Sequence, residues 1–216
     1  MPFRQALRLQ ERVRDDVAAG DAPETLLLLE HEPVITLGRH AQPGHVLASP
    51  EALAKDGIAV VPTSRGGDVT FHGPGQLVGY PVFRLPAGIK AHVVAMASAI
   101  VAVLAELAIA AEWRAAQPGI WVGSDKICAV GVHVRRRVAM HGFALNASLD
   151  LAGFRTIVPC GLGDAGVTSI ARLRGSTPAL ADLAEQVAHA CARSFAMRMK
   201  RTSASASRLQ VANGES

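Results

Sequence analysis

Apolar residues at the start of the chain recur with the period of an amphipathic helix. Phe3, Leu7 and Val17 fall on one face of a helix, because residues three or four positions apart share a face. The pattern stops at Gly20, a residue type that commonly follows a helix end. The spacing therefore predicts a helix over residues 3–19.

Short apolar runs in the next part of the chain favour β-strands. We expect strands at residues 25–29 and 34–37, a buried strand at 58–62, and a further strand at 77–85. A short helix is expected at residues 50–55.

Three runs in the second half, at residues 120–122, 126–134 and 138–149, are typical of successive antiparallel strands. The three arginines at 135–137 would occupy the turn between the last two. Such a run is either a solvated hairpin tip or a docking element for an acidic partner.

Helices are expected on either side of these strands, at residues 93–111 and 179–197. The first is apolar enough to suggest a membrane span, but it is rich in alanine and interrupted by Glu106, which favours a buried core helix. Strands in hairpin clusters with helices between them predict an α+β (α/β) fold, a single domain with a central mixed β-sheet flanked by helices. This domain would cover residues 1–200, and the polar tail at 201–216 is expected to be mobile.

The composition narrows the classes of function. Hydrophobic residues make up 50% and charged residues 19%, which is typical of a globular protein. Aromatic residues are only 4%, so a surface that stacks on nucleic acid is not expected. The net charge of +4 favours an acidic partner.

The number and spacing of the cysteines do not favour a structural metal site or a set of disulfide bonds. Cys128, Cys160 and Cys191 cannot all pair within the chain, and no Cys-x-x-Cys spacing occurs. The charged, amphipathic beginning of the chain does not resemble a signal peptide. We therefore expect no metal site, no membrane insertion and a cytoplasmic location.

Residues 65–76 contain four glycines in twelve positions, which allows the backbone to approach a ligand closely. The segment is neither a P-loop nor a dinucleotide-binding fingerprint. It is either a binding loop or a long glycine turn that carries Arg65 and His72 by chance.

Lys126 and Cys160 carry the candidate chemistry. Lys126 begins an apolar alternating run, so its side chain either reaches out to solvent or points inward, where loss of hydration would help it to exchange a proton. Cys160 lies between a proline and a glycine, outside any periodic segment. Its thiol would need a basic neighbour to become nucleophilic; Lys126, His72 and His141 are the candidates.

Five segments occur in the order found in the lipoyl(octanoyl) transferase family, which the chain resembles. They are His31–Arg39, Arg65–Gln76, Pro118–Gly131, His141–Asn146, and the pair Pro159–Gly161 with Val167–Ile170. The resemblance implies the fold of the biotin and lipoate protein ligase catalytic domain. It also implies transfer of octanoyl from acyl carrier protein to a lysine of lipoyl domains, in 2-oxoacid dehydrogenase complexes and the glycine cleavage system, without a cofactor.

By position, the resemblance makes Cys160 the nucleophile that carries the acyl thioester and Lys126 its acid/base partner. His141 and Asn146 would give polar support. The substrate-binding residues it implies are Arg65, Gly66, Gly67, Asp68, Val69, Thr70, Phe71, His72, Ala129, Val130, Gly131, Gly142, Phe143 and Ala144.

Cys128 departs from the family, which commonly has a small residue there. By strand alternation Cys128 should share a face with Lys126, so it could compete as a thiol near the site. We favour Cys160, because Cys128 is embedded in an apolar strand.

Three other functions remain open at this stage. An ATP-dependent lipoate or biotin protein ligase would have the same fold but would need no thiol at position 160. A non-catalytic acyl- or carrier-binding protein would form no covalent intermediate, and a cysteine hydrolase would release free fatty acid.

Overall fold

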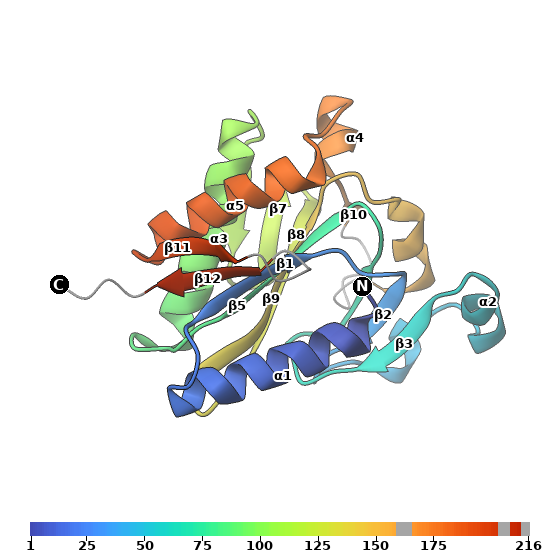
Figure 1. Cartoon of the computed structure of the whole chain (residues 1–216). Coiled ribbons are helices and arrows are strands. Elements are labelled where there is room, and N and C mark those ends of the chain that lie inside the picture. The colour runs from blue at the N-terminus through green and yellow to red at the C-terminus, as the bar shows by residue number, and fades with distance from the viewer. Residues whose placement is uncertain (159–165, 203–207, 213–216) are drawn as a thin grey trace.

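A large mixed β-sheet runs through the molecule (Figure 1). The computed structural model describes residues 1–158, 166–202 and 208–212. In this part of the chain the sheet has nine strands, and its path is β11-β12-β1-β5-β9-β8-β7-β6, with β10 pairing in parallel with β8. The bounds are β1 Thr25–Leu29, β5 Gln76–Val82, β6 Glu112–Arg114, β7 Gly119–Val122, β8 Asp125–Arg135, β9 Val138–Asn146, β10 Gly166–Val167, β11 Arg198–Thr202 and β12 Arg208–Ala212.

A smaller sheet lies beside the large one and has the order β3-β2-β4. Strands β2 (Val34–Leu37) and β3 (Ala59–Pro62) are parallel, whereas β2 and β4 (Val69–His72) are antiparallel. The parallel pair is connected through the 3₁₀ turn η1 (Pro43–His45) and the short helix α2 (Pro50–Lys55).

Helices cover both faces of the large sheet (Figure 1). Helix α1 (Phe3–Ala19) packs on β9 and β5, and on the opposite face α3 (Gly88–Glu106) packs against α5 (Leu180–Ser194). A 3₁₀ helix, η2 (Leu151–Thr156), and the short α4 (Ile170–Arg174) complete the described helices.

Strand β1 shows how the sheet is covered. Leu26 and Leu28 belong to the apolar cluster under α3 and α5, whereas Leu27 belongs to the cluster under α1. A strand with both faces buried needs a continuous apolar run rather than an alternating one. The run of four leucines in β1 meets this need.

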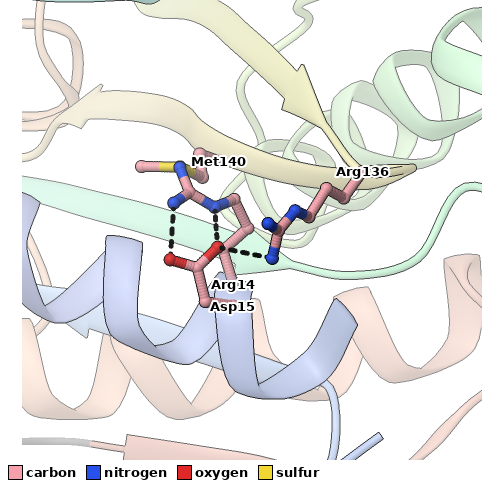
Figure 2. A network of polar contacts seen from close by, with 4 residues as sticks. All are labelled: Arg14, Asp15, Arg136 and Met140. Carbon is pink, nitrogen blue, oxygen red and sulfur yellow. Dashed lines mark hydrogen bonds and ion pairs between the residues drawn. The ribbon is translucent and has the colours of Figure 1, made fainter. Parts of the chain in front are cut away.

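A polar network fastens α1 to the β8–β9 hairpin (Figure 2). The buried guanidinium of Arg14 contacts Met140 Sδ at 2.9 Å and donates to the carboxylate of Asp15 at 2.9 and 3.0 Å. Asp15 also lies 4.0 Å from Arg136 at the hairpin turn, where both side chains are exposed. Arg136 and Arg137 have positive φ (52° and 62°), as a tight two-residue hairpin turn requires.

Most predicted elements are confirmed. The structure has the expected helices at 3–19 and 50–55, the strands at 25–29 and 34–37, and the antiparallel β7, β8 and β9 with arginines in the last turn. The α+β class with a mixed sheet is also confirmed.

Three expectations differ from the structure. Strand β3 is not buried, since Val61 is its one buried residue: β3 lies at the edge of the small sheet. The glycine-rich segment contains strand β4, which β2 holds by backbone pairing despite the surrounding glycines. Part of the expected tail forms strands β11 and β12, and β12 pairs with β1.

Helix α3 was expected to be a core helix. Among the described residues it is the one helix long and apolar enough to cross a membrane by composition. Met96, Ile100, Val103 and Leu104 are nevertheless buried in the cluster shared with α5. Its first turn carries the half-exposed Ile89, which lies at the cavity described next.

Candidate functional site

A cavity of about 600 Å³ lies over β5, β9 and β8, and its lining includes Phe3 of α1 and the beginning of α3. Its floor is a row of small residues in register, in which Ala129 of β8 faces Ala144 of β9, and Ala144 faces Val78 of β5. Small side chains in the middle of a sheet leave room for a ligand above it. The cavity therefore follows from the choice of residues on this face.

The segment 65–70 forms the roof of the cavity. Gly66 N–H donates to the Val132 carbonyl of β8 at 3.0 Å, which brings the loop onto the sheet. A Cβ on Gly131 would lie 2.9 Å from the Gly66 carbonyl oxygen. Glycine at 131 is therefore needed for this close approach.

The structure brings most of the predicted site residues together. Phe71 does not line the cavity, because its ring packs against Phe154 in a separate cluster, and Asn146 lies behind the lining rather than in it. The predicted residues that line the cavity are Arg65, Gly66, Gly67, Asp68, Val69, Thr70, His72, Lys126, Ala129, Val130, Gly131, His141, Gly142, Phe143 and Ala144.

Lys126 points inward rather than out to solvent. The residue is only 7% exposed, and its Nζ lies 3.5 Å from the Pro118 carbonyl oxygen and 4.8 Å from the centre of the Trp121 ring. Its aliphatic stem passes over Gly119, where a Cβ would lie 2.9 Å from Lys126 Cε. Glycine at 119 therefore gives the lysine its path into the cavity.

Polar side chains next to the cavity form a continuous hydrogen-bonded chain. Arg65 donates to Thr36 Oγ1 (2.9 and 3.1 Å), and this hydroxyl pairs with His72 Nε2 at 3.3 Å. His72 Nδ1 donates to Gln76 Oε1 at 2.7 Å. The proton of His72 is thus on Nδ1, and Nε2 accepts from Thr36.

The hydrogen-bonded chain continues beyond the cavity lining. Gln76 Nε2 donates to Asn146 Oδ1 at 2.9 Å, and Asn146 Nδ2 donates to the Thr168 carbonyl at 2.9 Å. Thr168 N–H donates to the Lys126 carbonyl at 3.1 Å. The hydrogen bonds thus connect the roof of the cavity, through His72, to the backbone of Lys126.

Burial keeps the histidines of this region neutral. Loss of hydration is the main cause that lowers the pKa of His72 and of His141 to about 3, and the nearby charge of Arg65 contributes to both shifts. Loss of hydration also lowers the pKa of His31 to about 4. At neutral pH they act as hydrogen-bonding aromatic rings and not as cations.

Cys160 lies outside the residues that the structure describes. The described residues on both sides of residues 159–165 are held by backbone hydrogen bonds and strand pairing. Val158 N–H donates to the His45 carbonyl at 2.9 Å, and on the other side Val167 of β10 pairs with Lys126 of β8. The chain therefore lies directly beside Lys126 at Val167.

The prediction that Cys128 lies on the same face of its strand as Lys126 is wrong. Ile120 pairs with Cys128 and Trp121 pairs with Lys126, so β8 has one more residue than β7 at this point, a β-bulge. The bulge interrupts the alternation, and Cys128 is fully buried in the core under α3 and α5. Burial raises the pKa of its thiol to about 12, which makes it a poor nucleophile.

Several residues at the site were not predicted. Phe3 and Tyr80 line the cavity, as do Trp113 and the first turn of α3. In the sequence Phe3 is one apolar position of a helical face, and nothing distinguishes it from a core residue. Tyr80 is the one tyrosine of the chain and lies within an apolar run. A polar hydroxyl in such a run is a weak indication of a buried functional position.

No group of three or more histidine, cysteine, aspartate or glutamate side chains in the described part of the chain is placed to hold a metal ion. The polar groups around the cavity are instead used by the hydrogen-bonded chain.

Residues 2–192 match the family of the lipoyl protein ligase A/B catalytic domain. Curated relatives include an octanoyltransferase of Chloroflexus aurantiacus, 46% identical over 86% of this chain and 86% of its own length. An octanoyltransferase of Solibacter usitatus is 46% identical over 91% of this chain and 90% of its own.

Solved structures with the same fold include lipoate protein ligases. One from Thermoplasma acidophilum with bound lipoic acid has a TM-score of 0.67 and 16% identity, covering 87% of this chain and 81% of that chain. A lipoate-protein ligase A bound with ATP has the same values. At this identity the likeness concerns the fold.

Proposed function

Because this chain belongs to the lipoyl protein ligase A/B catalytic domain family and is an acyltransferase, we propose that it transfers octanoyl from acyl carrier protein to a lysine of lipoyl domains. The acyl group would be held as a thioester on Cys160. The observation that carries the proposal is the buried amine of Lys126 at an apolar cavity of about 600 Å³.

In the first half-reaction, Lys126 Nζ takes the proton of the Cys160 thiol. The thiolate attacks the carbonyl carbon of the acyl carrier thioester, the new carbon–sulfur bond forms, and the bond to the phosphopantetheine sulfur breaks. Lys126 returns the proton to this leaving thiolate. The carrier leaves with a free thiol, and the acyl-enzyme remains.

In the second half-reaction, a neutral lysine amine of the lipoyl domain attacks the Cys160 thioester. An amide bond forms, the carbon–sulfur bond breaks, and the proton lost by the amine passes through Lys126 to the cysteine. No phosphate bond is broken in either half-reaction, so the reaction needs neither ATP nor a cofactor. The order of events predicts ping-pong kinetics.

The acyl chain would lie on the row of small residues formed by Ala129, Ala144 and Val78. The roof loop at 65–70 covers it. Loss of water from such a cavity stabilises each buried methylene by about 0.8 kcal/mol. The hydrogen-bonded chain beside the cavity ends at the backbone of Lys126, next to β10.

The test is the intact mass of the protein mixed with octanoyl-acyl carrier protein, without ATP. We expect a gain of one octanoyl group, located by peptide mapping in residues 156–172, which contain Cys160. Cys128→Ala is the matched control, because it removes the buried thiol and should leave the adduct unchanged.

Other outcomes would overturn the proposal. An adduct in residues 127–135 would assign the thioester to Cys128. Activity with free octanoate that requires ATP would indicate a ligase. Release of free octanoate, equal with and without a lipoyl domain, would indicate a hydrolase.

A further inference from the structure

Four aromatic rings close the end of the cavity away from Lys126. They belong to Phe3 of α1, His72 of β4, Tyr80 of β5 and His141 of β9, and we call them the end wall. Phe3 stacks on His72 with ring centres 6.2 Å apart, and Tyr80 contacts His141 edge-on at 6.4 Å. The end of the cavity is therefore built from elements that are far apart in the sequence.

A fifth ring, that of His31, packs against the end wall on the side away from the cavity. Its ring centre lies 5.1 Å from that of Phe3, 5.7 Å from that of His72 and 5.9 Å from that of Tyr80. His31 is buried and does not line the cavity. The packing of His31 therefore restricts movement of the end-wall rings away from the cavity.

The hydrogen bonds of the end wall are made to protein groups rather than to a ligand. The Tyr80 hydroxyl donates to His31 Nε2 at 2.6 Å, and His31 Nδ1 donates to the Met1 carbonyl at 3.0 Å. Both nitrogens of His72 are bonded, to Thr36 and Gln76. The wall therefore presents ring surfaces suited to a methyl group rather than to a polar chain end.

The floor of the cavity separates Lys126 from the end wall. One strand, β9, lies between β8, which carries Lys126, and β5, which carries Tyr80, so these two strands are about 10 Å apart. The registers of the strands also set Lys126 and Tyr80 at different levels along the sheet. A saturated eight-carbon chain, with bonds of about 1.5 Å, is roughly 9 Å long when extended. A chain that reaches the end wall would be stopped by its rings.

We propose that the end wall, and Phe3 in particular, sets the longest acyl chain that this enzyme transfers. The inference rests on the proposed function and adds to it a specificity-determining residue outside the predicted binding segments. Phe3 is chosen because apolar side chains lie behind it: Val34, Val61 and Leu7 form one cluster with its ring. Removing the ring would extend the cavity into apolar space.

The experiment measures single-turnover transfer to a lipoyl domain from hexanoyl-, octanoyl-, decanoyl- and dodecanoyl-acyl carrier protein. In the wild type, the rate should rise about fourfold per methylene up to the wall and fall tenfold or more beyond it. Phe3→Ala should raise the decanoyl-to-octanoyl ratio at least about tenfold. Phe3→Trp should shift the optimum in the opposite direction, toward hexanoyl.

Leu7→Ala is the matched control. Leu7 lies one turn further along α1 and packs in the same cluster as Phe3, but it does not line the cavity. This variant should lose stability to a similar extent and keep the wild-type chain-length profile. Since the readout is a ratio between donors, a partly unfolded sample does not change it.

The two hypotheses fail in different ways. A wild-type protein that transfers no acyl group from any donor would show that the proposed function is wrong. Transfer of octanoyl by the wild type, with both Phe3 variants keeping its decanoyl-to-octanoyl ratio within about twofold, would show that the end wall does not set the length.

Discussion

The two faces of the central sheet are formed by the same strands but have different roles. Toward α3 and α5, residues such as Leu145 of β9 and Cys128 of β8 pack into a continuous apolar core. Toward α1, the neighbouring Ala144 and Gly142 are small, and the space above them is the cavity. Alternation along one strand therefore separates the part that stabilises the fold from the part that holds the ligand.

The comparison predicts the largest effect at Lys126, on the cavity side. Lys126→Ala should slow acylation by octanoyl-acyl carrier protein by about 10²–10⁴-fold, the contribution expected of a positioned proton acceptor. The unfolding transition should remain cooperative, because Ile127 and Cys128 still anchor the strand in the core. A variant that forms the acyl adduct at the wild-type rate would remove Lys126 from the mechanism.

A pair of substitutions separates the two faces directly. Ala144→Leu fills the floor of the cavity, so octanoyl transfer should fall at least about tenfold while the free energy of unfolding changes by less than about 1.5 kcal/mol. Ile100→Ala, under α3, should cost about 2–5 kcal/mol of unfolding free energy and leave the transfer rate per folded molecule unchanged. Urea unfolding and single-turnover assays on both variants provide the test, and loss of activity in both would contradict the division.

The two faces also differ in how far the sequence predicts them. Apolar periodicity predicts the core elements well, because α1, β1 and β9 owe their burial to patterns that are visible locally. The positions of Lys126 and the binding segments came from motif resemblance. Periodicity alone left open whether the lysine points inward.

What could not be predicted depends on contacts between distant segments. The bulge in β8 arises from pairing with β7, so simple alternation placed Cys128 on the wrong face. Strand β4 is held by β2 although its surroundings are rich in glycine, a residue that disfavours strands. Phe3 becomes part of the cavity because α1 crosses β5 and β9, which no local pattern encodes.

The neutral histidines on the cavity side predict a pH dependence of stability. His31 and His72 have pKa values of about 4 and 3 in the folded protein, below the value near 6.5 of an unfolded chain. Below pH 6.5 the unfolded chain therefore binds more protons, and the free energy of unfolding should fall as the pH drops from 6.5 toward 4. Above pH 6.5 these groups should contribute no further change.

Urea unfolding at a series of pH values tests this behaviour. His31→Gln removes one titrating group, so the slope between pH 6 and 4 should decrease by up to one proton, about 1.4 kcal/mol per pH unit. Leu7→Ala, which removes no titrating group, is the control and should leave the slope unchanged. If the unfolding free energy had the same dependence on pH in all three proteins, the buried imidazole of His31 would not be kept neutral in the folded state.

The smallest effect is expected at the exposed hairpin turn, where the sequence left two interpretations open. Arg136 lies 4.0 Å from Asp15 of α1 (Figure 2). Both side chains are exposed, so solvent and salt weaken the pair. Arg136→Ala should therefore leave the thermal midpoint unchanged and alter kcat/KM for octanoyl-acyl carrier protein by less than about twofold at low salt, as expected of a solvated tip. A severalfold fall that disappears at high salt would instead identify the turn as a docking element, because long-range attraction acts on association and is screened by ions.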